Sequence, residues 1–398
     1  MQKVAIIGHS FSSRLGLIRS VAQMDCEIIV VVLVNSDEEI IKPEKPIDCY
    51  SKYVHRVLYC LRKDKEMFIR LLLNDLRDPA QKIILIPDSD DIVALIDENK
   101  ERLSNYFYFP RILGERDSIT EWMDKSRQKE LARQVGLNVA NARIVDITDG
   151  RYVIPSDVNY PCYTKPLATM NGGKGGMQRC GNEIELVSAL EFFIRHRNRS
   201  GRILVEDYKV ITKEYAVCGF SDGKNVVIPG VLQLLEISKV NKGIALQGRV
   251  MPINGFETII NSFKEMIVKI GFVGLFDIDF YESDGRLYFC ELNLRIGGSG
   301  YAITKMGINL PAMYVNMCIG KDWSDAHIKE KNAIYVNERM CLADWNLGYM
   351  TNKEFYTIIK TADIRFIDDD DDIGPQKRFK KICKKRRLIN SMKRILSK

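Results

Sequence analysis

Acidic and amide side chains recur at every second position in two neighbouring segments of the chain. Asp277 and Asp279 share one face of the first segment, and Glu291, Asn293 and Arg295 share one face of the second, because alternate residues of a strand point the same way. Three acids and an amide on one face are costly unless a cation neutralises them. Oxygen ligands of this kind predict Mg²⁺, with substrate phosphates completing its coordination. The alternative is a polar, solvated face with a surface ion pair.

Basic and glycine-rich residues precede these two segments. Lys125 and Lys165 are candidate phosphate-binding side chains, and Arg295 can offer its guanidinium to a transferring phosphoryl group. A loop after Lys165 can bind phosphates through its backbone N–H groups. The loop consists of Gly172, Gly173, Lys174, Gly175 and Gly176. It is not a Walker loop, because its lysine is followed by Gly rather than Ser or Thr. Taken singly, each lysine is also typical of a solvated surface, and the loop is also typical of a flexible hairpin.

The order of these motifs resembles that of the ATP-grasp superfamily. Along the chain come Lys125, Lys165-Pro166 with the glycine-rich loop, Val205-Glu206-Asp207-Tyr208, Lys213-Glu214-Tyr215, Asp279 and Glu291-x-Asn293-x-Arg295. The resemblance covers residues 118–310, and the ordered set is more specific than any one motif. Residues 7–20 look loosely like the first residues of carboxylate–amine ligases that act on amino acids or cell-envelope precursors.

The resemblance implies a nucleotide-binding role for several residues. Lys125 and Lys165 would contact the phosphates of ATP, with the loop 172–176 closing over them. Adenine would lie against Glu206, Asp207 and Tyr208, and Glu214 would bind the ribose hydroxyls.

The resemblance also implies the metal and catalytic residues. Asp279, Glu291 and Asn293 would hold Mg²⁺, for which Mn²⁺ can substitute. Arg295 and Lys165 would be the catalytic side chains, with Arg295 stabilising an acyl phosphate. The role of Asp277 stays open, and Lys239 and Lys242 lie where some relatives place a lysine for the γ-phosphate.

The activity implied is ATP- and Mg²⁺-dependent ligation of a carboxylate to an amine or a thiol through an acyl phosphate. Such chemistry needs no nucleophilic side chain. Two alternatives remain: a phosphotransferase that releases a stable phosphorylated product, and a nucleotide-binding scaffold without turnover. The particular acid and amine are not readable from the sequence.

Short apolar strands alternate with helices in the first 115 residues, which predicts an open α/β domain with a parallel sheet. The expected strands are Lys3–Gly8, Ile28–Val34 and Lys82–Pro87, and the expected helices are Ser12–Gln23 and Met67–Leu76. The turn 8–13 suits an anion at a helix N-terminus or a tight capped turn equally well. Asp88–Asp91 follows the third strand, where open α/β sheets place ligands. These acids would cap the next helix or meet an amine substrate.

The second part of the chain is predicted to be an α+β fold of two lobes. A helix expected over Asp117–Val135 begins it. Short Asp-Gly turns indicate antiparallel hairpins. The expected strands are Cys162–Pro166, Ile203–Tyr208, Glu214–Phe220, Asn225–Leu234, Phe276–Tyr281 and Arg286–Leu292. The predicted division is a pre-ATP-grasp domain over 1–115, lobe A with its glycine-rich lid over 116–205, lobe B with the metal site over 206–320, a C-terminal segment over 321–376 and a basic tail over 377–398.

Composition favours a cytoplasmic globular protein of two or three domains. The chain has 398 residues, and its apolar runs are too short to span a bilayer. The ten cysteines are scattered and form no Cys-x-x-Cys motif, which indicates reduced thiols rather than disulfides. The four histidines are far apart in the sequence and show no spacing typical of zinc ligands. The net charge of +7 comes from eleven Lys or Arg in 377–398, so the remainder carries −4. A nucleic-acid partner is therefore not expected.

The basic tail forms an amphipathic pattern with Phe379, Ile382 and Cys383 on one face. Such a helix can lie on an anionic membrane surface, and a disordered tail or one docked on the acidic body is the alternative. The five aspartates Asp368–Asp372 before it could bind cations, but they are interpreted as a solvated hinge. Homodimers are common in the family, although the sequence does not fix the oligomeric state.

Overall fold

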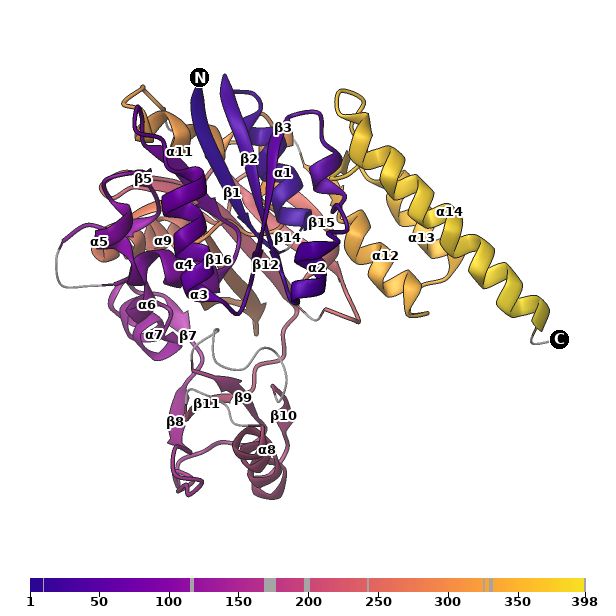
Figure 1. Ribbon diagram of the computed structural model, residues 1–398. Helices are drawn as coiled ribbons and strands as arrows, with labels where there is room; N and C mark the ends of the chain where they lie inside the picture. The colour runs from indigo at the N-terminus through magenta and orange to yellow at the C-terminus, as the bar shows by residue number, and fades with distance from the viewer. Residues whose placement is uncertain are drawn as a thin grey trace.

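The computed structural model describes residues 1–9, 11–114, 118–167, 177–196, 201–241, 243–324, 326–328 and 332–396. Three sheets organise the chain, and Figure 1 shows a smaller lobe below two larger layers. The predicted α/β plus α+β architecture is confirmed. The glycine-rich loop 172–176, Lys242 and Asp117 lie outside the described residues.

The first sheet is parallel, with strand order β3-β2-β1-β4-β5. Its strands are β1 (Gln2–Gly8), β2 (Cys26–Val34), β3 (Val54–Leu61), β4 (Ile83–Pro87) and β5 (Phe107–Tyr108). Alternate residues of β1 enter two different cores, because Val4 and Ile6 pack with α1 (Phe11–Val21) while Ala5 and Ile7 pack with the helices of the other face. Those helices are α3 (Lys65–Arg70), η2 (Leu71–Leu76) and α4 (Asp90–Glu98). The helix expected over Met67–Leu76 is confirmed, as α3 followed directly by η2, which is a π-helix. Short helices α2 (Asp37–Ile41), α5 (Lys100–Leu103) and η1 (Asp48–Tyr50) complete the domain.

The smaller lobe is a four-stranded antiparallel sheet with one helix on it. The strand order is β10-β9-β11-β8. The elements are β8 (Ala142–Asp146), β9 (Cys162–Pro166), β10 (Arg179–Cys180), α8 (Glu183–Arg195) and β11 (Arg202–Asp207). Leu186, Leu190 and Phe193 of α8 pack on Ile203 and Val205 of β11, which gives this lobe its own core.

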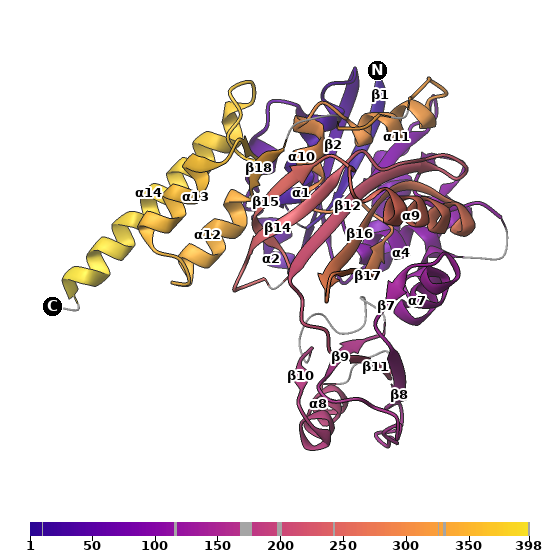
Figure 2. The same cartoon turned by 180° about the vertical axis from the view of Figure 1, so that it is seen from behind.

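The largest sheet lies behind the first one in the view of Figure 1, faces the viewer in Figure 2, and carries the acidic hairpin. Its main path is β19-β18-β15-β14-β12-β16-β17-β7, with β13 and β6 beside it. The strands are β6 (Arg111–Ile112), β7 (Asn138–Val139), β12 (Lys213–Asp222), β13 (Val226–Val227), β14 (Val231–Ile237), β15 (Ala245–Met251), β16 (Phe272–Ser283), β17 (Arg286–Asn293), β18 (Ala333–Val336) and β19 (Ile364–Arg365). Helix α9 (Glu257–Ile270) covers one face; α10 (Gly300–Lys305), α11 (Leu310–Cys318) and α1 lie on the other.

Two expected elements are interrupted in the structure. The helix expected over 117–135 is two helices, α6 (Ile119–Trp122) and α7 (Lys125–Gln134), because Asp124 starts a new helix by accepting the N–H groups of Ser126 and Arg127. The strand expected over 225–234 divides into β13 and β14 around Pro229-Gly230. Proline has no N–H for a sheet, and a Cβ at Gly230 would lie 2.7 Å from the carbonyl oxygen of Met251.

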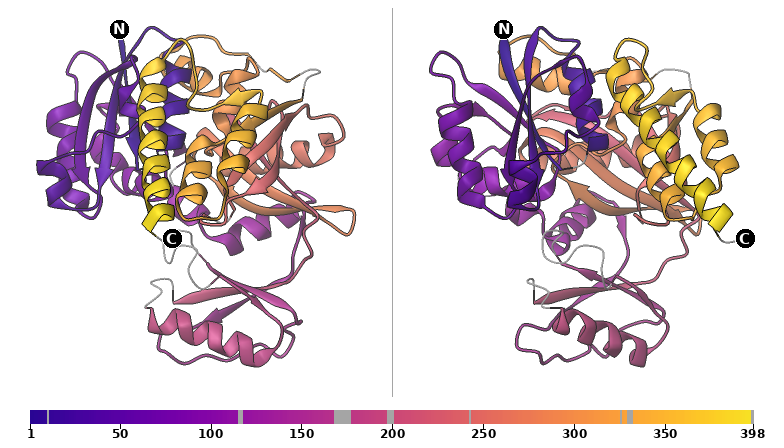
Figure 3. Two further views of the ribbon diagram at one scale, coloured as in Figure 1. Left: turned by 90° about the vertical axis from the view of Figure 1, so that its right-hand side faces the viewer. Right: turned by 45° about the vertical axis from the view of Figure 1, so that its right-hand side comes forward.

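Three helices at the C-terminal end pack on one another beside the large sheet (Figure 3). They are α12 (Glu338–Asn346), α13 (Asn352–Thr361) and α14 (Ile373–Leu396). Phe379 and Cys383 of α14 are buried against this group, and Ile382 packs at its edge. The apolar face expected on the basic tail is thus covered by protein in this stretch. Within the described residues, no helix is long and apolar enough to cross a membrane. All ten cysteines are free thiols.

The aspartate run is not a solvated hinge. Asp372 is fully buried and pairs with the Arg19 guanidinium at 3.0 Å, while its other oxygen accepts the N–H of Lys52 at 2.9 Å. Arg19 also donates to the carbonyl oxygens of Phe366 at 2.7 Å and Ile367 at 3.1 Å. The run therefore fastens the C-terminal helices to α1, an arrangement that charge density alone could not predict.

We expect Asp372→Asn to lower the free energy of unfolding by about 3 kcal/mol, because it removes the nearer counter-charge of the buried Arg19 and leaves only Asp369, at 4.0 Å. Asp370 belongs to the same run but is exposed, so Asp370→Asn is the matched control and should change stability very little. Urea unfolding of the two variants checks this. Equal stabilities for the two variants would contradict the role given to Asp372.

Candidate active site

The acidic hairpin brings its polar residues together as strand alternation predicts. In the register of β16 and β17, Asp277 is opposite Asn293 and Asp279 is opposite Glu291. Directly opposed residues of antiparallel strands have Cβ atoms about 5 Å apart on one face. A bulge follows the Asp279–Glu291 pair. Beyond it, Tyr281 and Tyr288 stack with ring centroids 5.5 Å apart.

Helix α7 places Lys125 on this pair of acids. The Lys125 ammonium donates to Glu291 at 2.9 Å, and Lys125 is 8% exposed. Gln128, one turn further along, exchanges two hydrogen bonds with the backbone of Leu292, at 3.0 and 2.8 Å. This side chain fixes the start of α7 against β17, so the position of Lys125 is set by the fold rather than by its own flexible stem.

A second ion-pair group lies in the small lobe around Glu206 of β11. Lys165, on the neighbouring strand β9, approaches Glu206 at 2.6 Å, and Lys129 pairs with its other oxygen. Burial alone would raise the pKa of Glu206, but the two lysines outweigh it and lower that pKa to about 2. Sequence reasoning missed Lys129. Its position four residues after Lys125, on the same face of a helix, was the available signal.

The other residues assigned to adenine and ribose lie next to Glu206 or on β12. Asp207 pairs with Arg143, and its N–H donates to Asn141 at 2.8 Å. The Tyr208 N–H donates to the carbonyl oxygen of Pro161 at 3.0 Å. Both N–H groups are thus already used within the lobe. Glu214 is half-buried on β12, opposite Tyr281.

Arg295 connects the acidic hairpin to the N-terminal domain. Its guanidinium pairs with Asp90 at 3.1 Å and donates to the Asn293 side chain at 3.4 Å. Burial would lower the pKa of Arg295, but the charges of Asp90, Asp277, Asp279 and Glu291 outweigh it and raise that pKa. The expected side-chain cap from Asp88–Asp91 is not found on α4 in the described structure; instead, Asp90 holds the arginine of the candidate site.

Asp277 differs from its neighbours because it is deeply buried. Its carboxylate accepts a hydrogen bond from the Cys218 thiol at 3.2 Å, and burial raises its pKa. A Cβ at Gly297 would lie 2.1 Å from an Asp277 oxygen, so only glycine allows the chain after Arg295 to pass over this acid. Asp277 supports the turn behind Arg295.

The oxygen donors fit a magnesium ion that is shared with a nucleotide. Two opposed carboxylates and an amide give hard oxygen ligands, and Mg²⁺ usually takes only one or two carboxylates with phosphates and water. Among the described residues, no three His, Cys, Asp or Glu side chains gather as a metal cage. The arrangement suits a metal that arrives with phosphates rather than one held by protein alone.

Lys239 lies in the loop after β14, where its backbone N–H donates to Asp344 of α12 at 2.7 Å. Its assignment to the γ-phosphate stays a prediction. Of the site residues expected from the sequence, the structure brings Lys125, Glu291, Asp279, Asn293 and Arg295 together and places Lys165 on Glu206.

Asp88 lies near Arg295, and its buried carboxyl group has a pKa close to neutral pH. Both of its oxygens are buried without a hydrogen-bond partner in the described structure, and burial raises its pKa to about 7. A raised pKa favours the folded state below the unfolded value of 3.8, and this contribution is lost as the pH rises through 7.

The Asn side chain does not titrate. We therefore expect the free energy of unfolding of Asp88→Asn, relative to that of the native protein, to increase by roughly 2 kcal/mol when the pH is raised from 5 to 8. Urea unfolding at the two pH values measures this difference. A constant difference over that range would show that Asp88 does not titrate in the folded protein.

Comparison with known proteins supports the fold. No family model matches the chain. N5-carboxyaminoimidazole synthetase from Staphylococcus aureus is 16% identical, with a TM-score of 0.62 over 87% of this chain and 86% of that one. The biotin carboxylase domain dimer of Hydrogenobacter thermophilus 2-oxoglutarate carboxylase, solved with MgADP and bicarbonate, is 18% identical, with a TM-score of 0.62 over 84% of this chain and 73% of that one. The L-amino acid ligase from Bacillus licheniformis is 17% identical, with a TM-score of 0.56 over 80% of this chain and 74% of that one.

Curated relatives by sequence include large chains of carbamoyl phosphate synthase. The one from Clostridium botulinum is 29% identical over 154 residues, which is 37% of this chain and 14% of that protein. The one from Methanocorpusculum labreanum is 24% identical over 189 residues, which is 46% of this chain and 18% of that protein. The chain thus spans less than a fifth of the length of these relatives.

Proposed function

Because the chain has the ATP-grasp fold, we propose that it is an ATP- and Mg²⁺-dependent ligase that joins a carboxylate to an amine or a thiol. The observation that carries this proposal is the opposed pair Asp279 and Glu291, with Lys125 on Glu291 and Arg295 beside both acids. Acids, cations and an amide are thus brought together at this hairpin, as phosphoryl transfer requires.

The proposed chemistry begins with a carboxylate, which is a poor electrophile until an oxygen is converted into a leaving group. Transfer of the γ-phosphoryl group to that oxygen gives an acyl phosphate, and attack by the amine then expels inorganic phosphate. Arg295 would bind the carboxylate and stabilise charge on the transferring group, and Asp90 keeps its guanidinium in place. Magnesium, held by Asp279, Glu291 and Asn293, would neutralise the phosphate oxygens.

We assign the nucleotide to the space between the small lobe and the large sheet. Lys125 and Lys165 would exchange their present carboxylate partners for phosphates, which is a modest change because both ammonium groups are already directed at anions. Asp207, Tyr208 and Glu214 would border the base and the ribose. The glycine-rich loop 172–176 would exclude water from the acyl phosphate.

The names of the structural neighbours support carboxylate activation. One is a carboxyaminoimidazole synthetase, one is an L-amino acid ligase, and one was solved with MgADP and bicarbonate. An amino acid or a cell-envelope precursor is accordingly our candidate substrate, with Mn²⁺ as a substitute metal. The alternative is a phosphotransferase of the same fold, which would release a phosphorylated product that survives water.

A substrate screen tests the proposal. ATP consumption is measured against pooled carboxylates and amino acids with Mg²⁺ present, and products are identified by mass spectrometry. Ligation gives ADP, phosphate and a condensed product, whereas a kinase gives ADP and a stable phosphoester. ATP consumption that no pool stimulates would contradict both.

We also propose a cytoplasmic protein that attaches peripherally to an anionic membrane surface through exposed lysines of α14. Lys380, Lys381, Lys384 and Lys385 are exposed while the apolar side of the helix is buried, so the attraction would be electrostatic. Deleting residues 377–398 would strip Phe379 and Cys383 from the core. Changing the four lysines to Gln is therefore the sharper test: sedimentation with phosphatidylglycerol vesicles should be lost, and unchanged sedimentation would exclude attachment.

A homodimer is the assembly suggested by the dimeric biotin carboxylase domain among the neighbours. Light scattering coupled to size-exclusion chromatography distinguishes a dimer from a monomer.

A further inference from the structure

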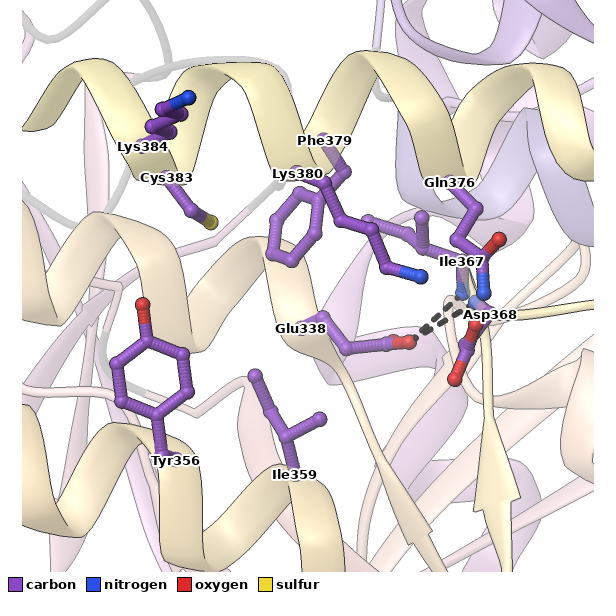
Figure 4. A pocket seen from close by; sticks show the side chains of 10 residues that line it. All are labelled: Glu338, Tyr356, Ile359, Ile367, Asp368, Gln376, Phe379, Lys380, Cys383 and Lys384. Carbon is purple, nitrogen blue, oxygen red and sulfur yellow. Dashed lines mark hydrogen bonds between the residues drawn. The ribbon is translucent and has the colours of Figure 1, made fainter.

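The C-terminal helices border a cavity of about 360 Å³ whose lining residues all lie outside the candidate active site. Figure 4 shows Tyr356 and Ile359 of α13 facing Phe379 and Cys383 of α14 across it, with Glu338 of α12 at its base and Lys384 at its outer edge. The volume lies in the range of small-molecule pockets, which usually combine apolar walls with a few polar groups. We call this space the helical cavity.

Apolar side chains form most of the wall of the helical cavity. Ile359 and the ring of Tyr356 face it from α13, and Phe379 and Cys383 face it from α14. Ile367, just after β19, closes one end. A hydrocarbon chain or a ring would suit these walls, because its binding would cover apolar surface that is otherwise in contact with water.

Two lysines of α14, Lys380 and Lys384, also line the helical cavity. In Figure 4 the Lys380 side chain extends along the cavity in the direction of Gln376. Neither lysine has a hydrogen-bond or ion-pair partner in the part of the chain that the structure describes. Residues 377–386 contain seven Lys or Arg and no acid, so the potential on this side is positive.

The two carboxylates of the cavity, Glu338 and Asp368, both contact other groups of the protein. Glu338 accepts the backbone N–H groups of Phe366, Ile367 and Asp368 at 2.9, 3.0 and 3.2 Å. One oxygen of Asp368 pairs with Arg365 at 2.7 Å, and its other oxygen is buried without a hydrogen-bond partner in the described structure. The ammonium groups of α14 are the cations of the cavity wall without a protein partner among the described residues, and they favour an anion.

We propose that the helical cavity binds an anionic amphiphile, with its phosphate or carboxylate head on Lys380 and Lys384 and its hydrocarbon part between α13 and α14. The head can belong to a soluble alkyl phosphate or to an anionic lipid, since the recognised chemistry is the same. The proposal is independent of the ligase activity, because no cavity residue belongs to the active site.

Octyl phosphate is the probe for this site, and isothermal titration calorimetry of the full chain measures its binding. Octanol lacks the charge and inorganic phosphate lacks the chain, so both should bind far more weakly. Lys380→Gln/Lys384→Gln should weaken octyl phosphate about tenfold, which corresponds to two partly exposed ion pairs. Lys381→Gln/Lys385→Gln removes the same charge from the same helix outside the cavity, and should leave affinity unchanged. Ile359→Trp, which fills the cavity, should abolish binding.

Several outcomes would overturn the site. These are absence of octyl phosphate binding to the native chain, equal weakening by the two lysine pairs, or undiminished binding by a folded Ile359→Trp protein. The lysine variants change exposed residues only, so the test does not depend on the tryptophan variant folding. Competition by phosphatidylglycerol vesicles assigns the site to a lipid head group, and its absence assigns it to a soluble amphiphile; either supports the cavity.

Discussion

Replacing Glu291 with Gln is expected to lower ATP-dependent product formation by about a thousandfold, the loss typical of removing a group that stabilises transferring charge. Glu291 lies opposite Asp279 in the hairpin and carries Lys125 at 2.9 Å. The amide keeps the shape of the side chain but removes its charge, so the loss should appear in kcat and in the Mg²⁺ concentration needed for half-maximal rate.

Glu282→Gln is the matched control for this experiment. Glu282 lies on the same hairpin and pairs with Lys213 at 3.0 Å, away from the acid pair. Its substitution should leave the rate within about twofold, because exposed ion pairs contribute little. If Glu291→Gln formed product at the native rate, or if the two variants lost activity equally, the metal assignment would fail.

Glu206→Gln should destabilise the small lobe by about 3 kcal/mol, because it leaves Lys129 and Lys165 facing a neutral amide in a buried place. Loss of this carboxylate should also weaken ATP binding, since Glu206 is one of the residues assigned to adenine. Hydrogen exchange of the amides in β8, β9 and β11 measures the lobe separately from the rest of the chain.

The lowered pKa of Glu206 fixes how this effect depends on pH. A depressed carboxyl pKa stabilises the folded state above the unfolded value of 4.5, and the contribution is lost as the pH falls toward 2. The difference between native protein and variant should therefore be constant above pH 5 and shrink in acid.

Glu191→Gln on α8, whose exposed carboxylate pairs with Arg195 at 3.6 Å, is the control and should change protection very little. If the small-lobe amides of Glu206→Gln were as protected from exchange as those of the control, the stabilising role given to the ion pairs of Glu206 would be refuted.

The fold was predictable where each element had a local signal. The alternation of β1, β2 and β4 with helices indicated a parallel sheet, and the Asp-Gly turn before Arg286 indicated the hairpin that opposes Asp279 and Glu291. Breaks within elements were less visible: Asp124 restarts a helix through its own side chain, which a periodicity of apolar residues does not reveal. The domain limits drawn from the sequence stay predictions.

Contacts between distant segments account for most of what sequence reasoning missed in the site. Lys129 reaches Glu206 across 77 positions, and Asp90 meets Arg295 only because the N-terminal domain packs against the hairpin. Similarly, Asp372 reaches Arg19 across 353 positions. A run of aspartates carries no local sign of such a partner, so composition suggested a solvent-exposed segment where the structure has a buried ion pair.

An oxygen-isotope transfer measurement tests the proposed acyl phosphate most directly. A carboxylate substrate found in the screen is labelled with ¹⁸O in its carboxyl group and incubated with the protein, Mg²⁺, ATP and the amine. If an acyl phosphate forms, one labelled oxygen passes to the inorganic phosphate as the amine displaces it. Unlabelled phosphate, or a stable phosphoester in place of free phosphate, would contradict ligation at the Asp279–Glu291 site.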